Sequence, residues 1–257
     1  MTEPILETRK ISKRFGNIQA LNGVDIKIHA NSVLALCGDN GAGKSTLIKI
    51  ISGVYHSDSG EIFSSGKPIK INSPRDAYKF GIETVYQDLA LCENLNVVQN
   101  LFLCREKSYE GNFISNFFLD NKKMFDEAEK VFNILGTTIP SLNNQISTLS
   151  GGQRQAVAIA RAVVWGSRLV ILDEPTAALG VDQTENVHKI IKNLREQGVG
   201  VVLITHNMSD VFALADRVIV LRQGSKNAEM FTNSCSPDDV VRAITGSSTA
   251  GKINNEK

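Results

Sequence analysis

Five short apolar runs divide the sequence, and they constrain its fold more than any other feature does. Each is nearly continuous in apolar residues, which is typical of strands that are covered on both faces of a parallel sheet. The runs lie at 33–37, 82–86, 169–172, 201–205 and 217–221. Helical patterns separate some of them, as at 184–196, where apolar residues recur at helical spacing before Gly198. The pattern predicts an α/β chain built on a parallel sheet.

The N-terminal part and the middle of the chain have different patterns. Apolar and polar residues alternate at 24–28, and a turn at 58–60 precedes a further short apolar run, so we expect a small antiparallel sheet beside the main one. Between about 88 and 165 the strand patterns give way to helical ones, notably at 121–135, where Gly136 follows as a stop. We therefore expect a helical insertion there.

Charge and hydropathy narrow the classes of function. The 28 basic and 27 acidic residues leave a formal charge of +1, so no overall field draws nucleic acid to the chain. No apolar run approaches the roughly 20 residues that cross a bilayer, and residues 1–10 lack the layout of a signal peptide. We expect a domain at 1–245 inside the cell, followed by a flexible tail at 246–257 that is rich in Gly, Ser, Asn and Lys.

The cysteines show no close paired spacing of the kind that binds a metal. We expect reduced thiols that serve as small apolar residues. They are Cys37, Cys92, Cys104 and Cys235.

A glycine-rich segment with the spacing of a phosphate-binding loop follows the run at 33–37. It reads Gly38-Asp39-Asn40-Gly41-Ala42-Gly43-Lys44-Ser45 and continues into a predicted helix from Thr46 to Ser52. The glycines let backbone N–H groups converge on a phosphate, and the helix N-terminus favours negative charge. Lys44 is placed to reach the β- and γ-phosphates, and the Ser45 hydroxyl to bind Mg²⁺. A chance glycine turn is the alternative, but the flanking strand and helix are the context that the loop requires.

Two adjacent carboxylates, Asp173 and Glu174, follow the run at 169–172. Ligands of open parallel sheets bind at this end of the strands. Asp173 would hold Mg²⁺ through water, and Glu174 would position or deprotonate an attacking water. An isolated Asp-Glu pair would be a strand cap before the turn at Pro175, but a phosphate-binding loop in the same chain favours the catalytic interpretation.

A third segment is highly specific. It reads Leu149-Ser150-Gly151-Gly152-Gln153 and opens a predicted helix, so its backbone presents a second N-terminal anion site. A flexible helix start would not require this string.

Together the three segments make the chain similar to the nucleotide-binding subunits of ATP-binding-cassette proteins, from about Ile5 to Ile244. The resemblance implies a P-loop NTPase (RecA-like) core with a small antiparallel β subdomain and an inserted helical subdomain. It also implies binding of ATP and Mg²⁺, and ATP hydrolysis. In that family two copies meet head to tail, so each nucleotide would lie between the phosphate-binding loop of one copy and Ser150 to Gln153 of the other.

Three further residues match positions of the family. Phe15 matches the aromatic on which adenine stacks, with core packing as the alternative. Gln87 matches the glutamine that touches Mg²⁺ or the attacking water, and His206 the histidine that hydrogen-bonds the γ-phosphate. Because Gly38, Gln87, Asp173 and His206 come at the ends of predicted strands, one sheet edge is expected to gather them around the phosphates.

One position departs from the family. Where the family commonly has an aspartate that couples the two sites, the sequence Ala177-Ala178-Leu179-Gly180 ends in Gly180. The coupling between the sites is therefore in question, although Glu174 is present.

The resemblance favours transport over other uses of such an ATPase. DNA-associated relatives separate their two halves with very long coiled coils, whereas about a hundred residues separate Lys44 from Ser150 here. Ribosome-acting relatives generally carry two cassettes in one chain, whereas this sequence has one. A phosphate-loop kinase is a further alternative, but it leaves the segment at 149–153 unexplained. An ATPase for another solute, or one outside transport, stays open.

A finer resemblance concerns bacterial monosaccharide importers. It rests on segments at 76–77, 81–87, 95–97, 100–103 and 174–181. It implies a separate transmembrane permease, an indirect partnership with a periplasmic or extracellular sugar-binding protein, and a place at the cytoplasmic face of the membrane. Ribose, xylose, galactose and fructose are candidate cargoes, with fructose preferred because fructose-type subunits resemble this single cassette.

Overall fold

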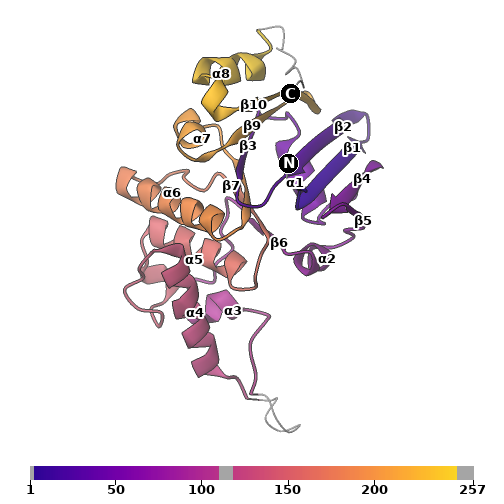
Figure 1. The fold of residues 1–257 in the computed structure, drawn as a ribbon. Helices are drawn as coiled ribbons and strands as arrows, with labels where there is room; N and C mark the ends of the chain where they lie inside the picture. Colours follow the sequence, from indigo (N-terminus) through magenta and orange to yellow (C-terminus); the bar gives the residue numbers. More distant parts are fainter. Residues whose placement is uncertain (1–2, 110–117, 248–257) are drawn as a thin grey trace.

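The computed structural model describes residues 3–109 and 118–247, and within them the strands form two sheets (Figure 1). In the larger sheet, β9 and β10 are antiparallel, and the other neighbouring strands are parallel. Its strands, in spatial order, are β10 (Ser225–Phe231), β9 (Arg217–Arg222), β3 (Val33–Cys37), β8 (Gly200–Ile204), β7 (Leu169–Asp173) and β6 (Ile82–Val85). The predicted parallel sheet is confirmed.

Alternate residues of the central strands enter two separate hydrophobic cores. In β3, Leu34 and Leu36 belong to one core, whereas Ala35 and Cys37 belong to the other. Successive side chains of a strand point to opposite faces of the sheet. The nearly continuous apolar runs therefore reflect burial on both sides.

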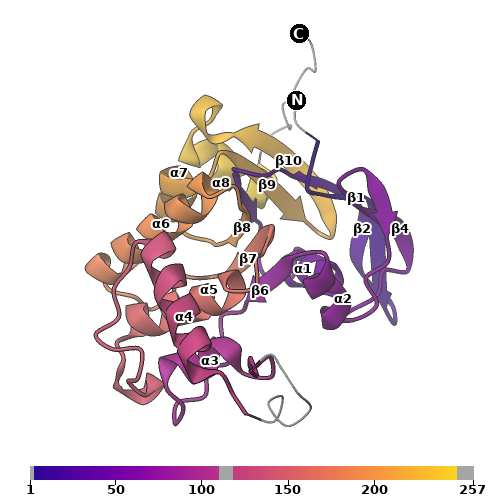
Figure 2. The ribbon, with the colours of Figure 1, turned by 60° about the horizontal axis from the view of Figure 1, so that its bottom comes forward.

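The second sheet and helix α1 (Lys44–Ile51) cover one face of the main sheet (Figures 1 and 2). This sheet is antiparallel throughout, as expected. Its strands, in spatial order, are β2 (Ile18–Ile28), β1 (Leu6–Phe15), β4 (Ser59–Ser64) and β5 (Lys67–Ile69). The short helix α2 (Pro74–Lys79) begins at Ser73, whose side chain accepts a hydrogen bond from the Asp76 backbone N–H.

The other helices and turns bury apolar residues in the core that contains Ala35 and Cys37, or lie at its rim. They are α3 (Val97–Phe102), α4 (Asn121–Leu135), α5 (Gly151–Val163), α6 (Val181–Glu196), α7 (Met208–Leu214) and α8 (Pro237–Thr245), with 3₁₀ turns at Ile146–Thr148 and Thr232–Ser234. Helix α4 has the predicted bounds, and it ends where Gly136 adopts a left-handed conformation at φ 64°.

Several element boundaries differ from the predicted ones by a few residues. The helix predicted at 184–196 begins at Val181, and the helix predicted at 46–52 begins at Lys44. The first residues of α6 are exposed or only half-buried, so they add nothing to an apolar periodicity. The strand at 82–86 ends at Val85, and that at 201–205 ends at Ile204.

Between β6 and β7 the described residues form helices, one 3₁₀ turn and two isolated bridges, joined by loops. These helices share their core with the main sheet, so burial alone does not divide the chain at 88 and 165, and the helical insertion stays a prediction. Of the expected tail, residues 248–257 lie outside the described residues. Within the described ranges, no helix is both long and apolar enough to span a membrane.

Candidate functional site

The ends of four parallel strands bring the predicted phosphate-site residues to one edge of the main sheet. Strand β8 lies between β3 and β7, and β6 lies on the far side of β7. Asp173 is the last residue of β7, whereas Gln87 and His206 come two residues after their strands. The loop that starts at Gly38, directly after β3, lies at the same edge. These residues therefore share one sheet edge, and their gathering around phosphates stays a prediction. The strand between β3 and β7 is β8, which comes after both of them in the sequence.

Two glycines of the loop have no room for a side chain. At Gly38, with φ 150°, a Cβ atom would lie 2.4 Å from the backbone oxygen of Leu221 at the end of β9. At Gly43, with φ 106°, it would lie 2.7 Å from the Ala20 backbone oxygen in β2. The loop is thus packed against backbone on two sides, which only glycine permits.

The loop encloses a cavity of about 300 Å³ at the start of α1. Residues of β2 complete the lining, which consists of Ile18, Gln19, Ala20, Asn40, Gly41, Ala42, Gly43, Lys44, Ser45 and Thr46. Lys44 Nζ donates hydrogen bonds to the backbone oxygens of Gly38, at 2.7 Å, and Asp39, at 3.1 Å. An ammonium group has three donors, so one N–H remains for an incoming anion.

Phe15 ends β1 at the hairpin turn next to this cavity. It pairs in register with Ile18, which lines the cavity. Its ring is 42% exposed and meets the edge of Tyr55, with centroids 5.4 Å apart. Lys13 Nζ lies over this ring, 5.5 Å from its centroid. Phe15 belongs to neither hydrophobic core, so the alternative of core packing is not what the structure shows, and stacking of adenine stays a prediction.

The two carboxylates after the apolar run of β7 have different surroundings. Burial, and then the charge of Glu174, raise the pKa of Asp173 above its ordinary value, while Lys44 and Lys49 oppose the shift. Glu174 has a left-handed backbone at φ 51°, and its N–H donates to the Ile204 oxygen at 2.9 Å. A non-glycine residue in this conformation is strained and requires support from its neighbours.

Glu174 and His206 form a pair. His206 Nδ1 lies 2.8 Å from Glu174 Oε1, and the imidazole is 81% exposed. An ionised carboxylate can only accept, so Nδ1 must carry the proton of this bond. In a neutral ring, Nε2 then carries no proton and cannot donate to a phosphate. While Nδ1 donates to Glu174, donation from Nε2 requires the imidazolium form.

The donor atoms at the sheet edge fit a magnesium ion. Ser45 offers a hydroxyl, Gln87 an amide oxygen and Asp173 a carboxylate, and Mg²⁺ prefers such hard oxygen ligands. No group of three or more His, Cys, Asp or Glu side chains suited to a metal occurs within 3–109 and 118–247. A site with so few carboxylates suits Mg²⁺, which keeps waters and binds substrate phosphates as well.

The segment Ser150 to Gln153 begins α5, away from this cluster. Ser150 Oγ accepts from the Gln153 N–H at 3.4 Å, and Gln153 Oε1 accepts from the Ser150 N–H at 3.0 Å. Gly152 packs on Gln183 of α6, where a Cβ would lie 2.9 Å from the Gln183 Cβ. Within the described part of the chain, no hydrogen bond or ion pair joins this segment to the phosphate-binding loop, Asp173, Glu174 or His206.

The sequence interpretation missed two groups of polar residues near the site. Asp210 in α7 binds Thr176 and His188, and Arg161 in α5 binds the backbone after Gln87. Asp210 reads as an ordinary acid in a first helical turn, and Arg161 as a base in a last turn. Their partners are distant in the chain, so no local pattern would have revealed them.

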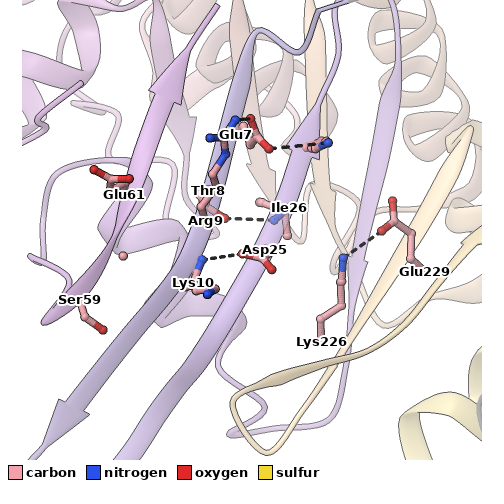
Figure 3. A pocket seen from close by; sticks show the side chains of 12 residues that line it. Glu7, Thr8, Arg9, Lys10, Asp25, Ile26, Ser59, Glu61, Lys226 and Glu229 are labelled. Atoms are coloured by element: carbon pink, nitrogen blue, oxygen red, sulfur yellow. Dashed lines mark hydrogen bonds and ion pairs between the residues drawn. The ribbon is translucent and has the colours of Figure 1, made fainter. Parts of the chain in front are cut away.

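A larger cavity, of about 800 Å³, lies between the antiparallel sheet and β10 (Figure 3). Four acidic and four basic residues line it, so it has no net charge to attract an ion. Glu7 pairs with Arg9 at 2.8 Å, and Lys226 with Glu229 at 3.1 Å (Figure 3). Its charges are largely paired with one another, and none of the predicted site residues lines it.

Comparison with protein families gives one match, described as "ABC transporter", over residues 21–177. Among curated proteins, the chain is 44% identical to the xylose/arabinose import ATP-binding protein XylG of Sulfolobus acidocaldarius, with 97% of both chains covered. It is 45% identical to the fructose import ATP-binding protein FrcA of Rhizobium meliloti, with 95% of both covered. A ribose import ATP-binding protein RbsA of Caldanaerobacter subterraneus is 40% identical, but the match spans 48% of that relative.

Solved structures with the same fold are ATP-binding cassettes. A nucleotide-free cassette from an ABC transporter superposes with a TM-score of 0.80 at 27% identity, covering 93% of this chain and 98% of that one. A dimeric cassette bound to ADP and Pi in a post-hydrolysis state has a TM-score of 0.72 at 26% identity, covering 88% and 98%.

Proposed function

This chain belongs to the ATP-binding-cassette (ABC) transporter family as an ABC-type ATPase, and from that premise we propose that it energises import of a monosaccharide through a separate transmembrane permease. The observation that carries the proposal is the sheet edge, where the Lys44 loop, Asp173 and the Glu174–His206 pair lie together. The names of its relatives support a sugar as cargo. XylG and FrcA are almost equally similar, so a pentose and fructose are both candidates.

Nucleotide binding is assigned to the cavity at the start of α1. Phe15 offers a face for adenine, backbone N–H groups from Asp39 to Thr46 bind the phosphates, and Lys44 supplies the cationic contact. Ser45, Asp173 and Gln87 would hold Mg²⁺, which when bound neutralises charge on the phosphates and orients them. Asp173 must be ionised for this role. Because burial raises its pKa, the ionised form is disfavoured without a cation, and Mg²⁺ would stabilise it.

Hydrolysis is assigned to Glu174 and His206. Glu174 orients a water and accepts its proton as the water attacks the γ-phosphorus, while the bond from ADP to that phosphorus breaks. His206 holds the Glu174 carboxylate through Nδ1 and, as an imidazolium, directs Nε2–H to the phosphate.

The complete site requires a second copy of the chain. The Ser150 segment lies away from the loop of its own chain, so a partner would bring its Ser150, Gly151, Gly152 and Gln153 to the nucleotide. The cassette pair would bind the permease at the cytoplasmic face of the membrane. A sugar-binding protein outside the membrane would act through the permease, and nucleic acid has no part in this cycle.

The decisive experiment for hydrolysis is Glu174→Gln. We expect kcat for ATP to fall by about 10²–10⁴, while the affinity for ATP stays within about twofold, because glutamine keeps the shape but accepts no proton. Glu185→Gln on the exposed face of α6 is the matched control, and its kcat should not change. Unchanged hydrolysis in Glu174→Gln would remove this residue from its role.

Cargo is tested separately with the permease. The chain is co-purified with its membrane subunits, reconstituted in vesicles with the sugar-binding protein, and supplied with fructose, xylose, arabinose or ribose. ATP hydrolysis should rise with one of these sugars. Stimulation by a different class of solute, or by none, would refute sugar import and leave the ATPase assignment intact.

A further inference from the structure

A buried carboxylate lies beside the hydrolytic site without belonging to it. Asp210, in the first turn of α7, is 1% exposed. Its Oδ2 accepts a hydrogen bond from Thr176 Oγ1 at 2.5 Å, and its Oδ1 lies 2.7 Å from His188 Nε2. A charge buried to this degree is stable only when its oxygens are bonded, and here two different segments bond them.

The three side chains connect the segments that present the two hydrolytic residues. Thr176 comes two residues after Glu174, Asp210 comes four residues after His206, and His188 extends from α6, which packs against α7. The Thr176–Asp210 bond therefore ties the chain that leaves Glu174 to the chain that leaves His206. The direct Glu174–His206 contact of 2.8 Å also joins them.

Glu174 needs such support because its backbone is strained. A left-handed conformation at a non-glycine residue costs of the order of 1–3 kcal/mol and persists only where the surroundings enforce it. The bond from the Glu174 N–H to Ile204 holds the residue on its N-terminal side, at the end of β8. The Thr176 hydroxyl holds it on its C-terminal side.

We propose that Thr176, Asp210 and His188 form a positioning cluster that holds Glu174 and His206 in the geometry required for hydrolysis. The proposal rests on the function assigned above to Glu174 and His206. None of the three lines the cavity assigned to the nucleotide, so the cluster acts on kcat and leaves ATP binding alone. In this cluster Asp210 accepts both hydrogen bonds, from the Thr176 hydroxyl and from His188 Nε2–H.

The first test removes one hydroxyl. Thr176→Val keeps the shape of the side chain but leaves Asp210 Oδ2 without its partner. We expect kcat to fall by about 10-fold or more, since small misplacements of catalytic groups cost up to about 10². The Kd for a fluorescent ATP analogue should change less than twofold, and Thr176→Ser should restore most of kcat.

Thr8→Val is the matched control. Thr8 is a buried threonine, whereas Thr176 is half-buried; the Thr8 hydroxyl likewise donates a hydrogen bond, to the Val24 oxygen at 3.2 Å, but it lies in the antiparallel sheet. It should lose stability to a similar degree and keep its kcat. If Thr176→Val loses no more kcat than Thr8→Val does, the cluster has no positioning role and the proposal fails.

A second readout needs no turnover. The chain has four histidines, so the imidazole signals can be assigned by NMR through single substitutions. In the nucleotide-free protein, Thr176→Val should shift the ring signals of His206, although the two side chains make no direct bond. Unchanged His206 signals would overturn the positioning cluster. This outcome does not depend on whether Glu174→Gln abolishes hydrolysis, so the two proposals can fail separately. Should Thr176→Val fail to fold, Asp210→Asn is subjected to the same two measurements.

Discussion

Gly180, the residue before α6, has room for a side chain. Its backbone is extended, at φ −73° and ψ 170°, and a Cβ atom there would meet nothing within 4 Å. It is the N-cap of α6 but has no side chain to bond the free N–H groups of the first turn. Aspartate, common in the family at this position, would therefore fit without strain.

We predict that Gly180→Asp stabilises the protein. Aspartate at an N-cap accepts from the first-turn N–H groups, and its advantage over glycine is on the order of a few tenths of a kcal/mol. Gly180→Ala lacks an acceptor and should be less stable than the natural chain. Chemical unfolding of the three proteins measures the order Asp, Gly, Ala; alanine as stable as aspartate would show that the cap is not bonded.

The thiols next to and far from the phosphate-binding loop should differ in reactivity. Burial raises the pKa of Cys37 to about 12, whereas Cys104 is exposed. At pH 8 a thiol of pKa 12 is ionised to about 1 part in 10⁴, and only the thiolate reacts.

Iodoacetamide should therefore modify Cys104 in the native protein and leave Cys37 intact from pH 7 to pH 9. Cys37 should react only after unfolding in urea. Mass spectrometry of the proteolytic peptides measures both rates, and equal rates in the native protein would contradict the burial of Cys37.

At the scale of elements, α5 is bonded directly to the loop after Gln87. Arg161, near the end of the helix that Ser150 opens, donates to the Leu89 and Ala90 oxygens at 2.8 Å and 2.7 Å. Ala90 has a left-handed backbone at φ 48°, so this loop also needs support. Burial lowers the pKa of Arg161, which shows that its charge is partly removed from water.

We predict that Arg161→Ala destabilises the protein by about 1–3 kcal/mol, because two backbone oxygens lose their donors. Amide hydrogen exchange should increase at residues 87–91. Arg161→Lys, with one ammonium in place of a two-pronged donor, should recover part of the loss.

The control is Arg75→Ala, on the exposed side of α2. It should change urea unfolding by less than about 0.5 kcal/mol. If Arg161→Ala behaves like this control, α5 does not hold the loop.

At the scale of the whole molecule, the two halves of the proposed site lie on different parts of one chain. The phosphate-binding loop follows β3, whereas Ser150 caps α5 and packs towards α6. A site that unites them needs two chains, which agrees with the dimeric cassette among the structures of the same fold.

We predict that two inactive variants complement each other. Lys44→Ala removes the cation of the loop, and Ser150→Arg blocks the other half of the site, so each protein alone should hydrolyse ATP poorly. A 1:1 mixture contains mixed dimers with one intact site, and about a quarter of the natural rate should return. Circular dichroism checks that both variants fold, and an inactive mixture would contradict a shared site.

The sequence by itself determined the elements and the chemistry of the loops. Strand positions, helix 121–135 and the phosphate-binding loop could be predicted because periodicity, glycine spacing and caps are local. Phe15, Lys44, Asp173, Glu174 and His206 were chosen from the sequence as site residues. The resemblance to a family added what no local pattern contains, namely the second copy of the chain.

Only the tertiary structure decided which residues meet. It placed β8 between β3 and β7, paired Asp210 with Thr176 and His188, and brought Arg161 to the loop after Gln87. The physical reason is that a sequence pattern reports whether a side chain is buried, but not which partner satisfies it. Such partners lie 22 to 72 residues apart here, and the packing of helices on a sheet selects them.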